Sequence, residues 1–223
     1  MLTATATTPL LEACCDSIVS ARDAQELGAG RIELCGAGAG GTTPSLGVIA
    51  RCRDELYVPL HVMIRPHVNG FVYCTDDLEV MKNDIIAARA LGVDGIVVGI
   101  LRSDDTIDVE RMAEVIQLAR PLKVTFHRAF DRTPDASGAL DMLLALGVDY
   151  VLTAGQAETA LDGVAQLQAL QLQAGNRLTI LAGGGVRAHN VRDVVARSGV
   201  REVHANATDS KVVREVLLAL TDA

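Results

Sequence analysis

The 223-residue sequence lacks the features that would direct it to a nucleic acid or a membrane. It has no run rich in lysine and arginine and a formal net charge of -8, whereas nucleic acids and acidic membranes bind clustered positive charge. No segment approaches the roughly 20 consecutive apolar residues that span a bilayer. The opening MLTATATTPL lacks the charged head and apolar middle of a signal peptide. We therefore expect a cytoplasmic protein with neither a nucleic-acid nor a membrane partner.

The sequence also lacks the cysteine spacings of a disulfide framework or a structural zinc site. There is no CxxC and no Cys/His pairing at zinc-finger spacing, and an odd number of thiols in a reducing compartment does not indicate disulfides. A free cysteine is usually a small buried hydrophobe. The five thiols are those of Cys14, Cys15, Cys35, Cys52 and Cys74.

One short pattern recurs along the chain: a helical segment, a glycine that stops it in left-handed geometry, and then a strand. Further apolar runs predict the strands that this pattern does not cover. The glycine pattern occurs in LGAGRIELC (27–35), LGVDGIVVG (91–99), LGVDYVLTAG (146–155) and SGVREVHANA (198–207), and the apolar runs are 10–15, 59–66, 123–130 and 178–186. Strands are therefore expected to begin near residues 10, 31, 59, 95, 123, 150, 178 and 201.

Each interval between predicted strands holds one amphipathic helix, such as residues 77–91. Alternating strands and helices at this spacing predict parallel strands with right-handed crossovers. Eight such units fit an α/β protein with a (β/α)8 TIM barrel. The competing open doubly wound sheet usually has fewer strands, and no GxGxxG follows the first strand. We predict a single TIM-barrel domain over residues 10–223, preceded by a disordered leader at residues 1–9.

Many positions that should point into this barrel are polar, whereas the opposite parity carries mainly Leu, Ile, Val and Phe. Buried unpaired charges cost several kcal/mol, so polar groups in a barrel interior need an explanation. One interpretation is a functional site at the C-terminal mouth. The other is a salt-bridge network in which Glu12 and Glu33 pair with Arg65 and the histidines. The inward set is Glu12, Cys14, Glu33, Cys35, His61, Met63, Arg65, Thr125, His127, Thr153, His204 and Asn206.

A glycine-rich turn and the absence of lysine indicate which ligands and reactions this mouth could support. AGGGVRAHNV (182–191) follows the seventh predicted strand, where many barrels bind a phosphate, so Gly183, Gly184 and Gly185 are predicted to bind an anion together with Arg65. No lysine lies near the C-terminal end of a strand, which excludes Schiff-base aldolase chemistry. Acid–base catalysis by Glu33 and His127, with Arg65 holding the substrate, stays open.

Several segments together resemble the CutC family of copper-homeostasis proteins. They are LEACCDSIVSARDAQELGAGRIELCG, GGTTPSLGVI, LHVMIRP, VTFHRAFD, VLTAG and GGGVRAHN, and the resemblance runs from about residue 10 to about residue 207. It implies a (β/α)8 barrel, a cytoplasmic location and a homo-oligomer. It also implies that Cys14 and Cys35 are the copper(I) ligands, a role that suits soft thiolates. Glu33, Arg65 and His127 fall on matching motif positions and would line the same mouth.

Three functional hypotheses remain open at this point. The first is a cytosolic copper-homeostasis protein that binds Cu(I) through Cys14 and Cys35. The second is an enzyme that acts on a small anionic metabolite, phosphorylated or carboxylated, by Glu/His acid–base chemistry. The third is a stable scaffold whose exposed face serves assembly.

Overall fold

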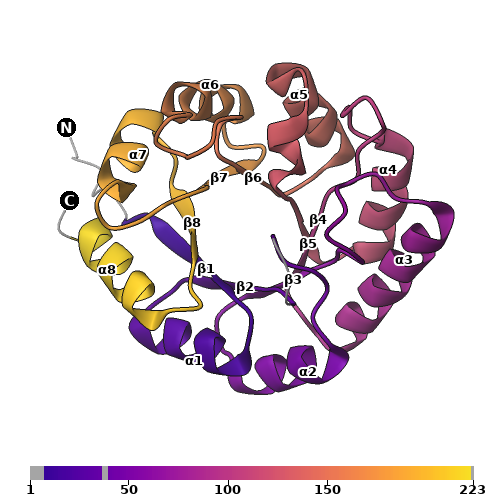
Figure 1. The fold of residues 1–223 in the computed structure, drawn as a ribbon, viewed down its shortest axis with the longest axis horizontal. Helices are drawn as coiled ribbons and strands as arrows, with labels where there is room; N and C mark the ends of the chain where they lie inside the picture. The colour runs from indigo at the N-terminus through magenta and orange to yellow at the C-terminus, as the bar shows by residue number, and fades with distance from the viewer. Residues whose placement is uncertain (1–7, 37–39, 222–223) are drawn as a thin grey trace.

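The computed structural model describes residues 8–36 and 40–221, and it confirms the predicted barrel. Each strand pairs in parallel with the next, and the last strand closes on the first (Figure 1). Every strand begins within one residue of its predicted start. The strands are β1 (Leu10–Cys15), β2 (Arg31–Leu34), β3 (Leu60–Met63), β4 (Gly95–Val98), β5 (Lys123–Phe126), β6 (Tyr150–Thr153), β7 (Thr179–Gly183) and β8 (Glu202–Asn206).

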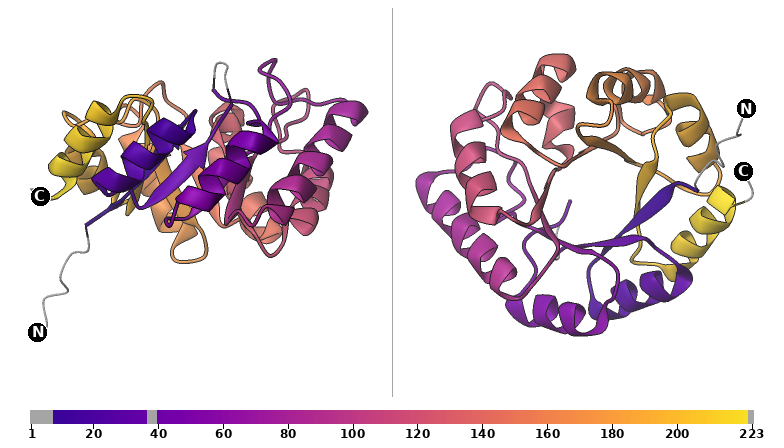
Figure 2. Two further views of the ribbon diagram at one scale, coloured as in Figure 1. Left: turned by 90° about the horizontal axis from the view of Figure 1, so that it is seen from below. Right: turned by 180° about the vertical axis from the view of Figure 1, so that it is seen from behind.

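The helices form one outer layer around the strands, as the right view of Figure 2 shows. They are α1 (Ile18–Leu27), α2 (Leu46–Glu55), α3 (Thr75–Ala90), α4 (Val109–Ala119), α5 (Ala136–Leu146), α6 (Val164–Ala174), α7 (Val191–Ser198) and α8 (Ser210–Thr221), with a 3-10 helix η1 (Arg128–Arg132) after β5.

Local sequence signals set the ends of these helices. The Ser17 side chain caps the first turn of α1 in a capping box with Ser20, and Gly28 ends that helix at a φ of 105°. Within the described residues, no helix is long and apolar enough to cross a membrane. The leader predicted at residues 1–9 falls mostly on residues 1–7, which lie outside the described residues, and it stays a prediction.

The apolar core lies between the barrel and the helices. Side chains of one strand parity, such as Ile32, Val124 and Phe126, are fully buried there. Cys15 belongs to this layer, as its parity predicts, and is completely buried. Burial of these apolar side chains drives the folding of the outer layer. Side chains at positions of the opposite parity, which include the polar residues, therefore point into the interior of the barrel.

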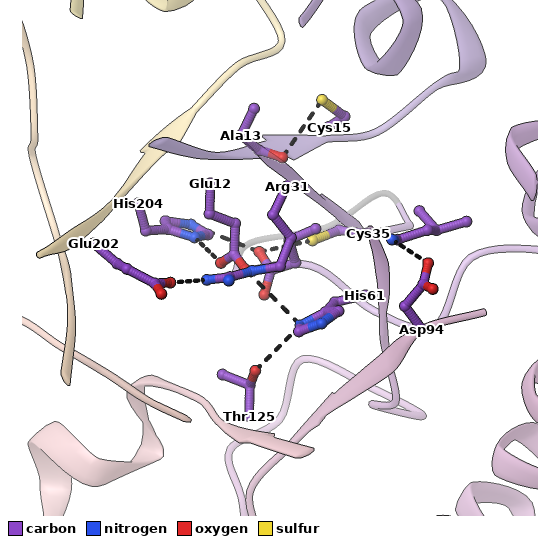
Figure 3. Close-up of polar contacts among 12 residues, drawn as sticks. Glu12, Ala13, Cys15, Arg31, Cys35, His61, Asp94, Thr125, Glu202 and His204 are labelled. Carbon is purple, nitrogen blue, oxygen red and sulfur yellow. Dashed lines mark hydrogen bonds and ion pairs between the residues drawn. The ribbon is translucent and has the colours of Figure 1, made fainter. Parts of the chain in front are cut away.

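A buried ionic cluster forms the floor of the barrel interior. Glu12 is fully buried and accepts a hydrogen bond from Nε of Arg31, while Nη2 of Arg31 lies 2.7 Å from Oε2 of Glu202. Nδ1 of His61 lies 4.0 Å from Oε2 of Glu12 and 3.5 Å from Oγ1 of Thr125 (Figure 3). Burial alone would raise the pKa of Glu12, but Arg31 and His204 outweigh it and hold that pKa well below its ordinary value. The floor is thus a charged but paired layer.

Gly95 leaves the space that the His61 ring of this layer occupies. The ring of His61 covers Gly95 of β4 so closely that a Cβ at Gly95 would lie 2.5 Å from the ring. Any larger residue at position 95 would displace His61 from its place beside Glu12.

The salt-bridge network expected as the alternative is present in part, because the histidines do pair with the glutamates. His204 contacts both Glu12 and Glu33, and His61 lies 4.0 Å from Glu12. Among the interactions described for Arg65, none is with Glu12 or Glu33; its Nη1 donates to the carbonyl of Gly41 at 3.0 Å and its Nη2 to that of Val68 at 3.3 Å. The arginine that pairs with Glu12 is Arg31, which lies beside it in the register of β1 and β2. Arg31 shares the inward parity of Glu33, so the alternation along β2 also predicts that Arg31 points into the barrel.

Replacing Arg31 with Met tests how much the fold depends on this pairing. The variant leaves the Glu12 carboxylate buried without its main counter-charge, and we expect the free energy of unfolding to fall by about 3–5 kcal/mol. Urea denaturation at pH 7 measures this change. Arg51→Met is the control because it breaks only exposed ion pairs, with Asp54 and Glu55, and should leave stability nearly unchanged. Equal stability of the two variants would show that Glu12 does not need Arg31.

Candidate functional site

A cavity of about 470 Å³ opens at the C-terminal ends of the strands. Its size lies in the range of small-molecule sites in proteins. Most of the predicted site residues line it, namely Cys14, Glu33, Cys35, Arg65, His127, Gly184 and Gly185. Gly183 ends β7, where a Cβ would lie 2.5 Å from the side chain of Leu152. Side chains from far-apart stretches of sequence therefore meet at one opening.

Two thiols meet on one side of this cavity. Cys14 lies near the end of β1 and Cys35 directly follows β2, and their Sγ atoms are 3.4 Å apart. Cys14 is half-buried and borders the cavity, whereas Cys35 is buried. The pairing of Cys14 with Glu33 in the parallel register of β1 and β2 brings the two sulfur atoms together.

His204 and Glu33 complete the sulfur side of the cavity. Nε2 of His204 lies 3.6 Å from Oε2 of Glu33, and the same oxygen lies 3.5 Å from Sγ of Cys35. One donor atom from each of Cys14, Glu33 and His204 lies within 4.8 Å of the others, which is close enough for one metal ion. The other ring nitrogen of His204, Nδ1, lies 2.8 Å from Oε1 of Glu12 (Figure 3). Such a carboxylate behind an imidazole fixes the orientation of the ring.

His127 lines the cavity as a hydrogen-bond donor. Its Nδ1 accepts the backbone N–H of Ala129 at 3.2 Å, so the proton of the neutral ring is on Nε2. Burial and the nearby Arg65 lower the pKa of His127 to about 3, which keeps the ring neutral. Within the described part of the chain, Nε2 of His127 has no hydrogen-bond partner. The side chain therefore offers one N–H to a ligand.

Comparison with known proteins places the chain in a family. The model of the CutC family matches residues 9–209, which is most of the sequence. The chain belongs to the CutC family. A mouse relative named copper homeostasis protein cutC homolog is 44% identical over 203 residues, covering 91% of this chain and 75% of the relative. A CutC family protein of Chromobacterium violaceum is 44% identical over 199 residues, covering 89% of this chain and 81% of the relative.

Solved structures agree with this assignment. The CutC crystal structure from Streptococcus agalactiae superposes with a TM-score of 0.84 at 34% identity, covering 90% of this chain and 100% of that one. A thiamine phosphate pyrophosphorylase from Pyrococcus furiosus reaches a TM-score of 0.66 at 16% identity, covering 96% of each chain. The second likeness shows the shared barrel fold alone.

In this chain the thiols of Cys14 and Cys35 differ in how readily they lose a proton. The hydrogen bond from Cys35, together with His204, holds the pKa of the Cys14 thiol well below its ordinary value, although burial opposes this. The same hydrogen bond, together with burial, raises the pKa of Cys35. Burial, with the charge on Cys14, raises the pKa of Glu33. Cys14 is therefore the thiol that ionises first.

Two residues at the mouth of the cavity were not predicted as site residues from the sequence. His204 was predicted to face inward but not to be a site residue, and the register of β1 with β8 places it beside Glu12. Arg128 follows His127 in the sequence and also lines the cavity. The strand pattern gave no direction for Arg128, because that residue begins the 3-10 helix η1. The predicted roles of Glu33, Arg65 and His127 in catalysis stay predictions.

Acid should destabilise this protein through His127. Its pKa is about 3 in the fold and 6.5 ordinarily, so the unfolded chain binds the proton more readily. The contribution of His127 to stability is complete above pH 6.5 and falls as the pH drops toward 3, by up to about 1.4 kcal/mol per pH unit. Urea denaturation between pH 7 and pH 4 should show a shallower decline for His127→Phe than for the wild type.

The comparison is specific to His127. His61, whose pKa burial lowers to about 4, contributes a similar decline that is present in both proteins and cancels in the difference. Parallel curves for the wild type and His127→Phe would contradict the neutral, buried state of His127.

Proposed function

We propose that this CutC family protein binds Cu(I) in the cytoplasm through Cys14 and Cys35. The observation that carries the proposal is the 3.4 Å separation of the two sulfur atoms at the edge of an accessible cavity. Thiolates are soft ligands that select Cu(I), and the reducing cytoplasm keeps both the thiols and the copper in the required state. Self-association, which the family resemblance implies, stays a prediction.

The surrounding groups fit a bound metal cation. The imidazole of His204 stands next to the thiols and provides a third donor of intermediate softness. Glu33 faces the same point, and its Oε1 has no hydrogen-bond partner among the described residues. The mouse relative named copper homeostasis protein cutC homolog supports copper as the cargo.

The same set of donor atoms could also bind a different cation. A thiolate, an imidazole and a carboxylate are also ligands of Zn²⁺. The second thiol, Cys35, does not separate the two metals, because two cysteines and a histidine also hold zinc in known sites. The preference for Cu(I) is supported by the reducing cytoplasm and by the mouse relative named for copper homeostasis. Binding of both metals should therefore be measured on the same protein.

Anaerobic competition with a chromogenic Cu(I) chelator tests the proposal. Fully reduced wild-type protein should withdraw one Cu(I) per chain from the chelator. Cys14→Ser/Cys35→Ser should bind it more than about 100-fold more weakly, since the loss of an outer-shell group alone costs 10–100-fold in metal affinity. Cys74→Ser is the matched control, because Cys74 is exposed at the start of α3 and outside the cavity lining.

The outcomes separate the alternatives. Wild-type affinity in the double variant, or an equal loss in Cys74→Ser, would contradict binding by the paired thiols. Tighter binding of Zn²⁺ than of Cu(I) under the same competition would make zinc the cargo. Retention of tight Cu(I) binding by Cys35→Ser alone would reduce the proposed ligand set to Cys14 and His204.

A further inference from the structure

The cavity also contains a turn built of backbone N–H groups. After β7, Gly184 and Gly185 have φ values of 109° and 66°, which a side chain with a Cβ rarely adopts. The N–H groups of Gly184, Gly185 and Val186 donate no hydrogen bond within the described part of the chain, and all three residues line the cavity. Successive N–H groups in such a turn form a concave surface that attracts anions.

A guanidinium lies against this turn. Nη1 of Arg128 would be 3.2 Å from a Cβ placed on Gly184, so the two groups are in close proximity. Nε of Arg128 pairs with Asp131 at 2.7 Å, and Asp131 in turn accepts the N–H of Ala154. Arg128 is therefore held in place by η1 and by the loop after β6. A fixed guanidinium beside free N–H groups is a favourable arrangement for binding phosphate.

A separate observation indicates a ligand larger than an ion. His127 is 3% exposed, lines the same cavity and has no partner for Nε2 among the described residues. The ring of Phe71 lies beside it, with the centroids 4.9 Å apart. A buried donor without a partner costs free energy that a bound ligand can recover. The cavity, at about 470 Å³, lies in the size range of small-molecule sites and leaves room for an organic group beside an anion.

We propose that this mouth binds a small phosphate monoester. Its phosphate lies on the Gly184–Val186 turn beside Arg128, and a hydroxyl or carbonyl oxygen of its organic part accepts a hydrogen bond from Nε2 of His127. Phosphate is favoured over carboxylate because its three acceptor oxygens match three successive N–H groups and a guanidinium. The proposal does not depend on Cu(I) binding, since neither cysteine takes part in it.

Isothermal titration of the full chain with three probes tests the proposal. The probes are inorganic phosphate, glycerol 3-phosphate as a monoester, and malonate as a dicarboxylate. We expect saturable binding of both phosphates, tighter for glycerol 3-phosphate, and weaker binding of malonate. Arg128→Gln should weaken both phosphates about tenfold or more, the loss expected of a charged hydrogen bond. His127→Phe should weaken glycerol 3-phosphate more than inorganic phosphate.

Two controls separate this site from general basicity and from the metal site. Arg132→Gln removes a guanidinium from the same 3-10 helix, one that is exposed and pairs with Asp105, and should bind as the wild type does. Cys14→Ser/Cys35→Ser should also keep wild-type phosphate affinity. Circular dichroism of each variant confirms folding.

The proposal fails if neither phosphate binds saturably, if Arg128→Gln binds as well as the wild type, or if Arg132→Gln loses as much as Arg128→Gln. Tighter binding of malonate than of glycerol 3-phosphate would show that the site selects carboxylates, which would contradict the assignment of a phosphate monoester. An equal effect of His127→Phe on inorganic phosphate and glycerol 3-phosphate would contradict the proposed hydrogen bond from His127 to the organic part of the ligand. Loss of phosphate binding in the double cysteine variant would contradict its independence from the thiols.

Discussion

The ionised Glu12 carboxylate connects the fold of this protein to the chemistry of its mouth. It is fully buried, and burial of an unpaired charge would oppose folding by several kcal/mol. The register of β1 with its two neighbours places Arg31 on one side of it and His204 on the other. Arg31 keeps Glu12 charged, and Glu12 orients the ring of His204 toward the thiols. The closed barrel is therefore needed for the arrangement of the proposed metal donors as well as for stability.

The mouth divides into two parts with different chemistry. Strands β1, β2 and β8 supply sulfur, imidazole and carboxylate, which suit a soft metal cation. Residues after β5 and β7 supply N–H groups and a guanidinium, which suit an oxyanion. A (β/α)8 barrel brings such segments together because every strand ends at the same face. One cavity can thus combine a metal site and an anion site without either using the residues of the other.

Much of this arrangement could be predicted from the sequence, because regular geometry governs it. Glycine stops and apolar runs located the strands, and the alternation of side chains along a strand identified Cys14, Glu33, Cys35 and His127 as inward-facing. Parity gives the direction of a Cβ and not the end point of a long side chain, so the pairing expected for Arg65 was wrong. Arg128 follows the strand in a 3-10 helix, where alternation no longer applies. Its place beside Gly184 required coordinates.

Diffraction at the copper absorption edge, from crystals grown anaerobically with Cu(I), tests the central claim most directly. The account predicts one anomalous peak per chain, between the sulfur atoms of Cys14 and Cys35 and next to the ring of His204, with Glu12 and Arg31 still paired beneath it. A peak at Cys74 or another surface position, or no peak in crystals of fully reduced protein, would contradict the account.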